Sequence, residues 1–184
     1  MLRVSSRIDI DDGIHLTGID YTDGPFLVKH LNHVEFSQNT CSIPYPYTKD
    51  DAKEFITRVI TFEEKNKIQR DWAIRNVDGE LIGCIGLLYD KGHESFRSEF
   101  GYWLLKDSWN QGLMTKVVAK FAVHILEHTK LVRLEALVFS DNLPSCRVLE
   151  KAGFIKEGFL KNAYQRNGKY IHAHLYARVK DTQS

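Results

Sequence analysis

A short segment in the second half of the chain is suited to holding a pyrophosphate. Residues 109–115 read Trp-Asn-Gln-Gly-Leu-Met-Thr and lie between a β-prone run and a helical pattern. The first amides of a helix lack intrahelical partners and carry the positive end of the helix dipole. Glycine lets a phosphate come close to the backbone. The segment matches neither of the two common nucleotide-binding glycine motifs, so an ordinary loop before a core helix also fits it.

A second segment, residues 140–154, has the form of a short helix with an N-cap at Asn142 and a glycine stop at Gly153. Alone, this is ordinary helix punctuation. Two carboxylates on β-prone runs, Glu99 and Glu135, are candidate bases that could take a proton from a substrate. Each also fits a structural ion pair, and that interpretation is favoured for Glu135.

Strands and helices are predicted to alternate around these segments. The apolar patterns predict strands at residues 14–20, 71–77, 80–90, 98–105, 132–138, 154–160 and 169–179. Helices are predicted at 24–34, from Thr48 onward, at 113–128 and at 142–152. Asp78-Gly79 and Asn167-Gly168 favour two-residue type I′ hairpin turns. A three-strand meander followed by a β–α–β crossover implies a mixed sheet.

The remaining stretches set the domain organisation. Residues 36–48 contain two prolines and are expected to be irregular, and residues 1–13 are expected to form a loose arm. We see no linker or internal repeat, so residues 1–184 are expected to form a single domain.

Composition narrows the function classes. The formal net charge is +1, which argues against nucleic acid as the main partner. Three distant cysteines are expected to be free thiols in a reducing compartment. The N-terminal residues have no apolar signal core, and no stretch has the roughly 20 apolar residues of a membrane span. We therefore expect a cytoplasmic protein that does not bind membranes.

Taken together and in order, the two segments resemble the GNAT (GCN5-related) N-acetyltransferase superfamily. The similarity is to its RimJ/RimL-like branch and is strongest over residues 97–160. It implies an α/β (α+β) fold with a mixed, mostly antiparallel central sheet and helices on both faces. The sheet is expected to splay between its fourth and fifth strands, here residues 98–105 and 132–138. The resemblance also implies acetyl-CoA as co-substrate.

The resemblance places the cofactor on both segments and on the strand before them. Pantetheine is expected to pair with the backbone of Tyr102 to Leu104, and the pyrophosphate to lie on the amides of Gln111 to Thr115. Asn142 and Ser145 are expected to approach the pantetheine, and an arginine to meet the CoA phosphates. The implied cofactor-binding residues are Tyr102, Trp103, Leu104, Trp109, Asn110, Gln111, Gly112, Leu113, Met114, Thr115, Asn142, Ser145 and Arg147.

The implied reaction is direct attack of a primary amine on acetyl-CoA in a ternary complex. Glu99 is the candidate base, and Ser145 is the candidate group that hydrogen-bonds the thioester or protonates the leaving sulfur. Leu149 stands where many relatives have a tyrosine acid, so the acid role is open. His172 and His174 alternate on one strand without a suitably spaced third ligand, so no metal is expected.

The sequence does not fix the acceptor. A protein N-terminal α-amine and a small-molecule amine are both compatible with the resemblance, as are a monomer and a homodimer. The acceptor pocket is expected to use four aromatic residues, Phe36, Tyr45, Tyr47 and Tyr164, although plain packing also explains them. Two alternatives lie outside this class: a non-catalytic CoA-binding sensor or interaction module on the same fold, and a protein that binds a different nucleotide.

Overall fold

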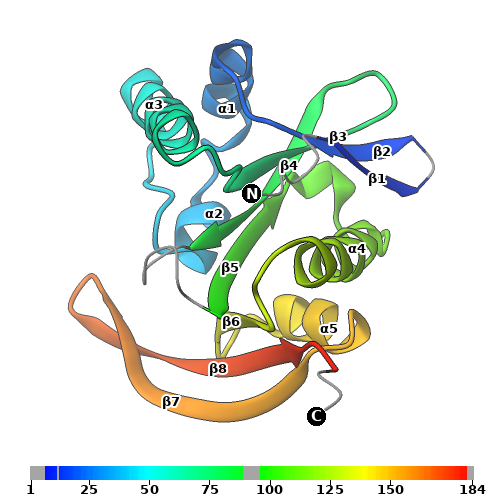
Figure 1. The fold of residues 1–184 in the computed structure, drawn as a ribbon. Coiled ribbons are helices and arrows are strands. Elements are labelled where there is room, and N and C mark those ends of the chain that lie inside the picture. Colours follow the sequence, from blue (N-terminus) through cyan, green and yellow to red (C-terminus); the bar gives the residue numbers. More distant parts are fainter. Residues whose placement is uncertain (1–6, 12, 89–95, 182–184) are drawn as a thin grey trace. The chain divides into compact units, whose positions relative to one another are not determined.

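The computed structural model describes residues 7–11, 13–88 and 96–181 (Figure 1). The chain forms two compact units. One comprises Met1–Gly86 and Tyr102–Trp109, and the other comprises Leu87–Gly101 and Asn110–Ser184. That the whole chain acts as a single domain stays a prediction.

The first unit is built on four antiparallel strands. In sheet order these are β1 (Ile8–Asp11), β2 (Ile14–Thr17), β3 (Asp71–Arg75) and β4 (Leu81–Leu88), the last belonging to this unit up to Gly86. The predicted loose arm is wrong for Ile8–Asp11. There isoleucines are buried and aspartates exposed in alternation, as in a strand with one face in the core. The rest of the expected arm, apart from Arg7 and Gly13, lies outside the described residues.

Helices connect β2 to β3. They are η1 (Tyr21–Asp23), α1 (Gly24–His30), α2 (Val34–Asn39) and α3 (Lys49–Asn66). The helix predicted over 24–34 is α1, which ends earlier, at His30, and a separate helix begins at Val34. The expectation of irregular structure from residue 36 is wrong for 36–39, which belong to α2. Prolines restrict mainly their immediate neighbours, and both prolines of this stretch come after α2. Three side chains after the start of α2 bond back to carbonyls three or four residues earlier, which supports the turn.

The loop between β3 and β4 differs from the predicted two-residue turn. It spans Asn76–Glu80, and only Gly79 among its residues has a positive φ, of 79°. A type I′ turn needs positive φ at both central residues. Instead the Asn76 side-chain oxygen accepts hydrogen bonds from the amides of Asp78 and Glu80 at 3.1 and 2.9 Å. This side chain organises a wider loop with a bulge at Arg75.

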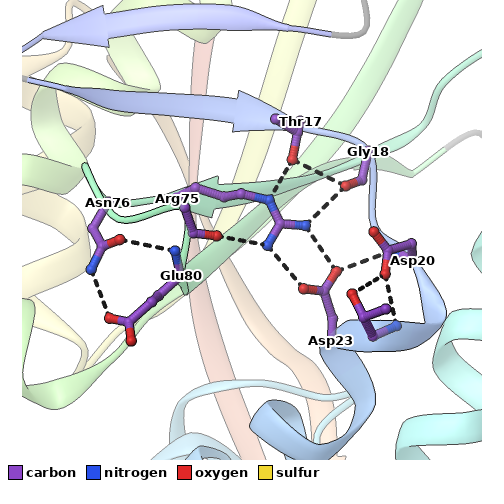
Figure 2. Close-up of polar contacts among 9 residues, drawn as sticks. Thr17, Gly18, Asp20, Asp23, Arg75, Asn76 and Glu80 are labelled. Carbon is purple, nitrogen blue, oxygen red and sulfur yellow. Dashed lines mark hydrogen bonds and ion pairs between the residues drawn. The ribbon is translucent and has the colours of Figure 1, made fainter.

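Arg75 joins this loop to the start of the helical region, as Figure 2 shows. Its guanidinium donates to both carboxylate oxygens of Asp23 at 2.9 and 3.0 Å and to the Thr17 hydroxyl at 2.6 Å. Asp23 is only 5% exposed. A buried carboxylate needs such a bidentate partner, so this ion pair fixes where α1 begins.

The second unit contains the parallel pairing of the molecule. In sheet order its strands are β5 (Arg97–Leu104, up to Gly101 here), β6 (Arg133–Phe139), β8 (Lys169–Val179) and β7 (Ile155–Arg166). β5 and β6 run parallel, and the other two pairs are antiparallel. Asn167 and Gly168 have φ of 48° and 75° between β7 and β8, so the predicted type I′ turn is confirmed.

Two helices cover one face of this sheet. They are α4 (Leu113–His128) and α5 (Leu143–Lys151), which lie side by side in Figure 1. Phe100 of β5 packs against Phe121 of α4 and against Phe154, with ring centroids 6.1 and 5.2 Å apart. The predicted helices at 113–128 and 142–152 are confirmed, as is a mixed, mostly antiparallel sheet.

β5 and β6 pair only briefly among the described residues. Their register runs from Arg97 opposite Arg133 to Glu99 opposite Glu135. β6 then continues along β8 as far as Phe139 opposite Ala173. This early end of the parallel pairing agrees with the predicted splay between these two strands.

Candidate active site

The expected phosphate-binding amides, Gln111 to Thr115, lie at the start of α4. Gly112 is the N-cap residue with φ 73° and ψ 0°, and Asn110 also has a positive φ, of 61°. A Cβ built on Gly112 meets nothing within 4 Å, so there is open space above this residue. Gly112 itself contributes no side-chain cap to the amides of the first turn, which favours a phosphate site there.

Helices α3 and α5, in contrast, each begin with a side-chain cap. In α3, Thr48 and Asp51 form a reciprocal capping box. In α5, the Asn142 side-chain oxygen accepts the Ser145 amide at 3.2 Å, which confirms the predicted cap. The open start of α4 is therefore a local feature of the 109–115 sequence.

The expected pantetheine strand lies in the first unit. Tyr102 and Trp103 are half-buried and Leu104 is buried. Trp109 is 37% exposed and its indole N–H donates to the Leu104 carbonyl at 2.7 Å. The Leu105 amide donates to Ile82 at 2.8 Å. Trp109 therefore shapes the end of β5 through that carbonyl, and the Leu105 amide is already bonded within the sheet.

The α5 residues of the expected site lie in the second unit. Asn142 and Ser145 are half-buried at the start of the helix, and Arg147 is exposed one turn later. Leu149, at the position of the absent tyrosine acid, is fully buried. The Asn142 oxygen caps the helix, and its amide nitrogen supplies two further N–H donors for a ligand.

Sequence analysis missed the buried residue that holds α5 on the sheet. The Tyr176 hydroxyl, on β8, donates to Glu150 of α5 at 2.9 Å, and Arg178 donates to the Ala152 carbonyl at 3.1 Å. Tyr176 is 1% exposed, and burial together with its hydrogen bonding to Glu150 raises its pKa. These two bonds hold the C-terminal end of α5 on β8.

The two candidate bases face each other across β5 and β6. Glu99 is half-buried and its Cα partner in β6 is Glu135. Glu135 accepts hydrogen bonds from Arg97 at 2.9 Å and from Arg133 at 2.6 Å. Burial raises the pKa of Glu135, but the bonds from the two arginines outweigh this and leave it lowered. Glu135 is thus part of an ion pair, which is the role that the sequence analysis favoured for it.

The signal for this ion pair was present in the sequence. Residues 97–99 and 133–135 both read Arg-x-Glu, so each strand carries a cation and an anion on one face. Their partnership depends on strand register, which the sequence does not specify.

The four aromatic residues expected in the acceptor pocket have different environments. Phe36 and Tyr47 are each 5% exposed, and Phe36 meets Trp103 edge-on at 5.9 Å. Tyr45 is 56% exposed. Tyr164, in the second unit, packs edge-on against Phe139 at 5.2 Å. Packing thus accounts for Phe36 and Tyr47, while the exposed Tyr45 is the one available to a ligand in solution.

Lys106, the first residue of η2 (Lys106–Ser108), forms an ion pair with α2 within the first unit. Its ammonium bonds to Glu35 of α2 at 2.7 Å. α2 is thereby tied to the segment after β5 by this ion pair, and to β5 itself by the Phe36–Trp103 contact.

No cluster of three or more His, Cys, Asp or Glu side chains suited to a metal ion occurs within residues 7–11, 13–88 and 96–181. His172 accepts the Asn162 amide at 2.9 Å, and His174 lies 3.4 Å from the Lys156 ammonium.

Over the same ranges, no helix is both long and apolar enough to cross a membrane. A cytoplasmic location, the lack of a nucleic-acid partner and the oligomeric state stay predictions.

Comparison with known proteins identifies this arrangement. Residues 14–155 match the Acetyltransferase (GNAT) domain. The chain belongs to the GNAT acetyltransferase family. An uncharacterised N-acetyltransferase of Bacillus subtilis, YoaA, is 35% identical over 136 residues, which cover 71% of this chain and 75% of YoaA.

Two further comparisons place the chain within the family. A ribosomal-protein-serine acetyltransferase of Escherichia coli is 35% identical over 106 residues, covering 58% of this chain and 59% of that protein. The solved structure of RimL, a ribosomal L7/L12 α-N-protein acetyltransferase in complex with coenzyme A, superposes with a TM-score of 0.84. It is 21% identical and the match covers 95% of this chain and 98% of RimL. The expected RimJ/RimL-like GNAT identity is confirmed: this chain is an acetyl-CoA-dependent N-acetyltransferase.

Proposed function

We propose that this GNAT enzyme acetylates the α-amino group of a protein N-terminus, with the CoA pyrophosphate on the first turn of α4 and Glu99 as base. The observation that carries the cofactor assignment is the open helix start at Gly112, which has no side-chain cap and no atom within 4 Å of a built Cβ. Phosphate oxygens on the amides of the first turn would supply the missing cap. The amides of Gln111 to Thr115 would form this cradle, and exposed Arg147 is available for phosphate contacts.

The rest of the proposed cofactor site follows the family resemblance. Tyr102, Trp103 and Leu104 would pair with pantetheine through their backbone, at the end of β5 that Trp109 shapes. Asn142 and Ser145 would approach it from α5. Ser145 is the proposed donor to the thioester or leaving sulfur, since no tyrosine stands at position 149.

An α-amine suits a site with a single carboxylate base. With a pKa near 7.8, an α-amine is about one-seventh neutral at pH 7, whereas a lysine with a pKa near 10.4 is about one part in 2,500 neutral. In the proposed reaction the amine nitrogen attacks the thioester carbon and its proton passes to Glu99. The carbon–sulfur bond then breaks, and the sulfur takes a proton. The ribosomal-protein-serine acetyltransferase among the relatives supports a protein acceptor.

Thermal stability with acetyl-CoA, CoA, ATP and NAD tests the cofactor first. A ligand at 100 times its Kd adds about 2.7 kcal/mol of stability. We expect stabilisation by acetyl-CoA and CoA only. A shift with ATP or NAD but none with acetyl-CoA at millimolar concentration would refute the cofactor site.

Thiol release with an acceptor panel then tests the acceptor. Peptides with free and with blocked N-termini should be compared with free amino acids and polyamines. We expect turnover with free N-terminal peptides and none with the blocked forms. Faster turnover of a free amino acid or polyamine would replace the protein acceptor with a small one, and binding without turnover on any amine would indicate the sensor alternative.

A further inference from the structure

Four charged side chains share one face of the sheet where β5 and β6 pair. Residues two apart on a strand point to the same face, and directly paired residues face the same side. The register pairs Arg97 with Arg133 and Glu99 with Glu135, so these four lie together. The opposite face, with Phe100, packs against α4. The charged face is therefore the one that α4 leaves free.

Glu135 is the centre of an ion-pair network on this face. It accepts Arg97 Nη1 with both oxygens, at 2.9 and 3.2 Å, and Arg133 Nε at 2.6 Å. Arg133 also donates to both oxygens of Glu157 on β7, at 3.0 and 2.5 Å. The small residue Ala177 lies opposite Glu135 on the intervening strand β8, which leaves room for the arginine to pass over it.

The members of the network differ in burial. The Glu135 side chain is 15% exposed, while those of Arg97 and Glu157 are 38% and 37% exposed. Exposed ion pairs contribute little, but a half-buried carboxylate that binds two guanidinium groups is hard to replace, since its loss removes the acceptor that Arg97 and Arg133 share. The network should therefore depend on Glu135 more than on Glu157.

The network lies at the point where the strands separate. Glu99 opposite Glu135 is the last parallel pair described, and β6 continues with β8 alone. The ion pair between Arg97 and Glu135 thus connects β5 to β6 across the three residue pairs that precede the splay. The position of Glu99 depends on this tie because Glu99 belongs to the final pair.

We propose that Glu135 is a positioning residue, which holds Arg97 and Arg133 and thereby fixes Glu99 and the separation of β5 from β6. This inference rests on the proposed function, in which Glu99 is the base. The charged residues on the sheet face that Glu99 shares with β6 include Arg97 on its own strand and Arg133 and Glu135 on β6, and Glu157 of β7 is bonded to Arg133.

The test compares Glu135→Gln with Glu157→Gln, which makes the same chemical change at the outer end of the network. With a saturating peptide acceptor, we expect Glu135→Gln to lower kcat by about tenfold or more, with the KM for acetyl-CoA within about twofold. Glu157→Gln should change neither by more than about twofold. Thermal melts would first establish that both variants are folded at the assay temperature.

The pH profile of kcat provides the readout that a purely structural role would not move. Glu135→Gln removes one negative charge beside Glu99 and keeps the positive charges of Arg97 and Arg133, so the acidic limb should move to lower pH. Arg97→Gln removes one cation and should move that limb to higher pH. The acceptor amine is common to all variants, so its own titration cancels in the comparison.

The outcomes separate this inference from the proposed function. If Glu99→Gln keeps full turnover and the same acidic limb, Glu99 is not the base and the proposed mechanism is wrong. If Glu99→Gln loses turnover but Glu135→Gln and Arg97→Gln leave both kcat and the limb unchanged, Glu135 has no positioning role. If Glu135→Gln does not fold, the opposite shift expected for Arg97→Gln still decides the question.

Discussion

The starts of α3 and α4 differ in how the unpaired amides of the first helical turn are capped. Both are long helices whose first amides lack intrahelical partners. At α3 the Thr48 side chain accepts the Asp51 amide, and the Asp51 carboxylate accepts the Thr48 amide at 2.7 Å. At α4 the residue in the same position is Gly112, in a left-handed conformation and without a side chain.

The difference separates a structural helix start from one left open for a ligand. A capping box satisfies amides permanently, and it places a carboxylate where an anion would otherwise bind. The first turn of α4 contains no acidic residue, whereas that of α3 contains Asp50 and Asp51. The helix dipole favours an anion at the N-terminus of both helices, but of the two only α4 has a first turn without a negative charge of its own.

The largest expected effect comes from closing the open start of α4. Gly112→Asp would place a carboxylate at the N-cap, where it repels the pyrophosphate and competes for the same amides. We expect the Kd for acetyl-CoA, measured by calorimetry, to rise about a hundredfold, which is about 2.7 kcal/mol. The space above Gly112 is open, and the strain of a side chain at its positive φ is shared with the control variant below.

Gly112→Asn is the matched control, because asparagine has the same shape and tolerates the left-handed conformation. It should weaken acetyl-CoA binding far less than the aspartate does. Equal losses in the two variants would mean that side-chain bulk, not charge, disturbs the site, and unchanged binding in both would remove the α4 cradle from the cofactor site.

An intermediate effect is expected at α5, which combines a cap with a proposed ligand contact. Asn142→Ala removes the oxygen that accepts the Ser145 amide. Loss of such a cap costs about 1 kcal/mol of unfolding free energy, and we expect acetyl-CoA affinity to fall several-fold as well. Urea unfolding and calorimetry measure the two quantities. A loss of stability with full affinity would assign Asn142 to the helix alone.

A smaller effect, confined to stability, is expected at α3. Thr48→Ala opens the capping box and should cost about 1 kcal/mol, seen as a lower urea midpoint with an unchanged slope. The KM for acetyl-CoA should stay within about twofold. A larger change in KM would show that the start of α3 contributes to cofactor binding, which would weaken the contrast with α4.

These local features were mostly predictable, because they depend on residues close in sequence. Thr48 with Asp51, Asn142 with Gly153, and the open segment before Leu113 could all be read directly. Asp78-Gly79 shows the limit of this approach: it was expected to turn like Asn167-Gly168. The side chain of Asn76 instead binds two amides of the loop and widens it.

The ion pairs of the site depended on information that the sequence does not carry locally. Arg97 and Glu135 are 38 positions apart, and they meet only because β5 and β6 are parallel and in that register. A shift of one residue would move each side chain to the other face. Strand β1 was missed for a related reason, since its four residues gain their stability from pairing with β2.

The smallest expected effect is a pH dependence that belongs to α3 and not to α4. Hydrogen bonds from the Thr48 side chain, and then from its amide, lower the pKa of Asp51 below its ordinary value of 3.8. A carboxyl group whose pKa is lower in the folded state stabilises the protein above the unfolded pKa, and this contribution is lost as the pH falls through the folded pKa.

The difference in melting temperature between the wild type and Thr48→Ala should therefore be constant near neutral pH and narrow below about pH 4. In an Asp51→Asn background the same difference should not vary with pH, since the group that titrates is gone. A gap that stays constant to pH 2.5 in the wild-type background would show that the cap does not depend on the Asp51 charge. The first turn of α3 would then differ from that of α4 only by the presence of a side-chain acceptor, not by its negative charge.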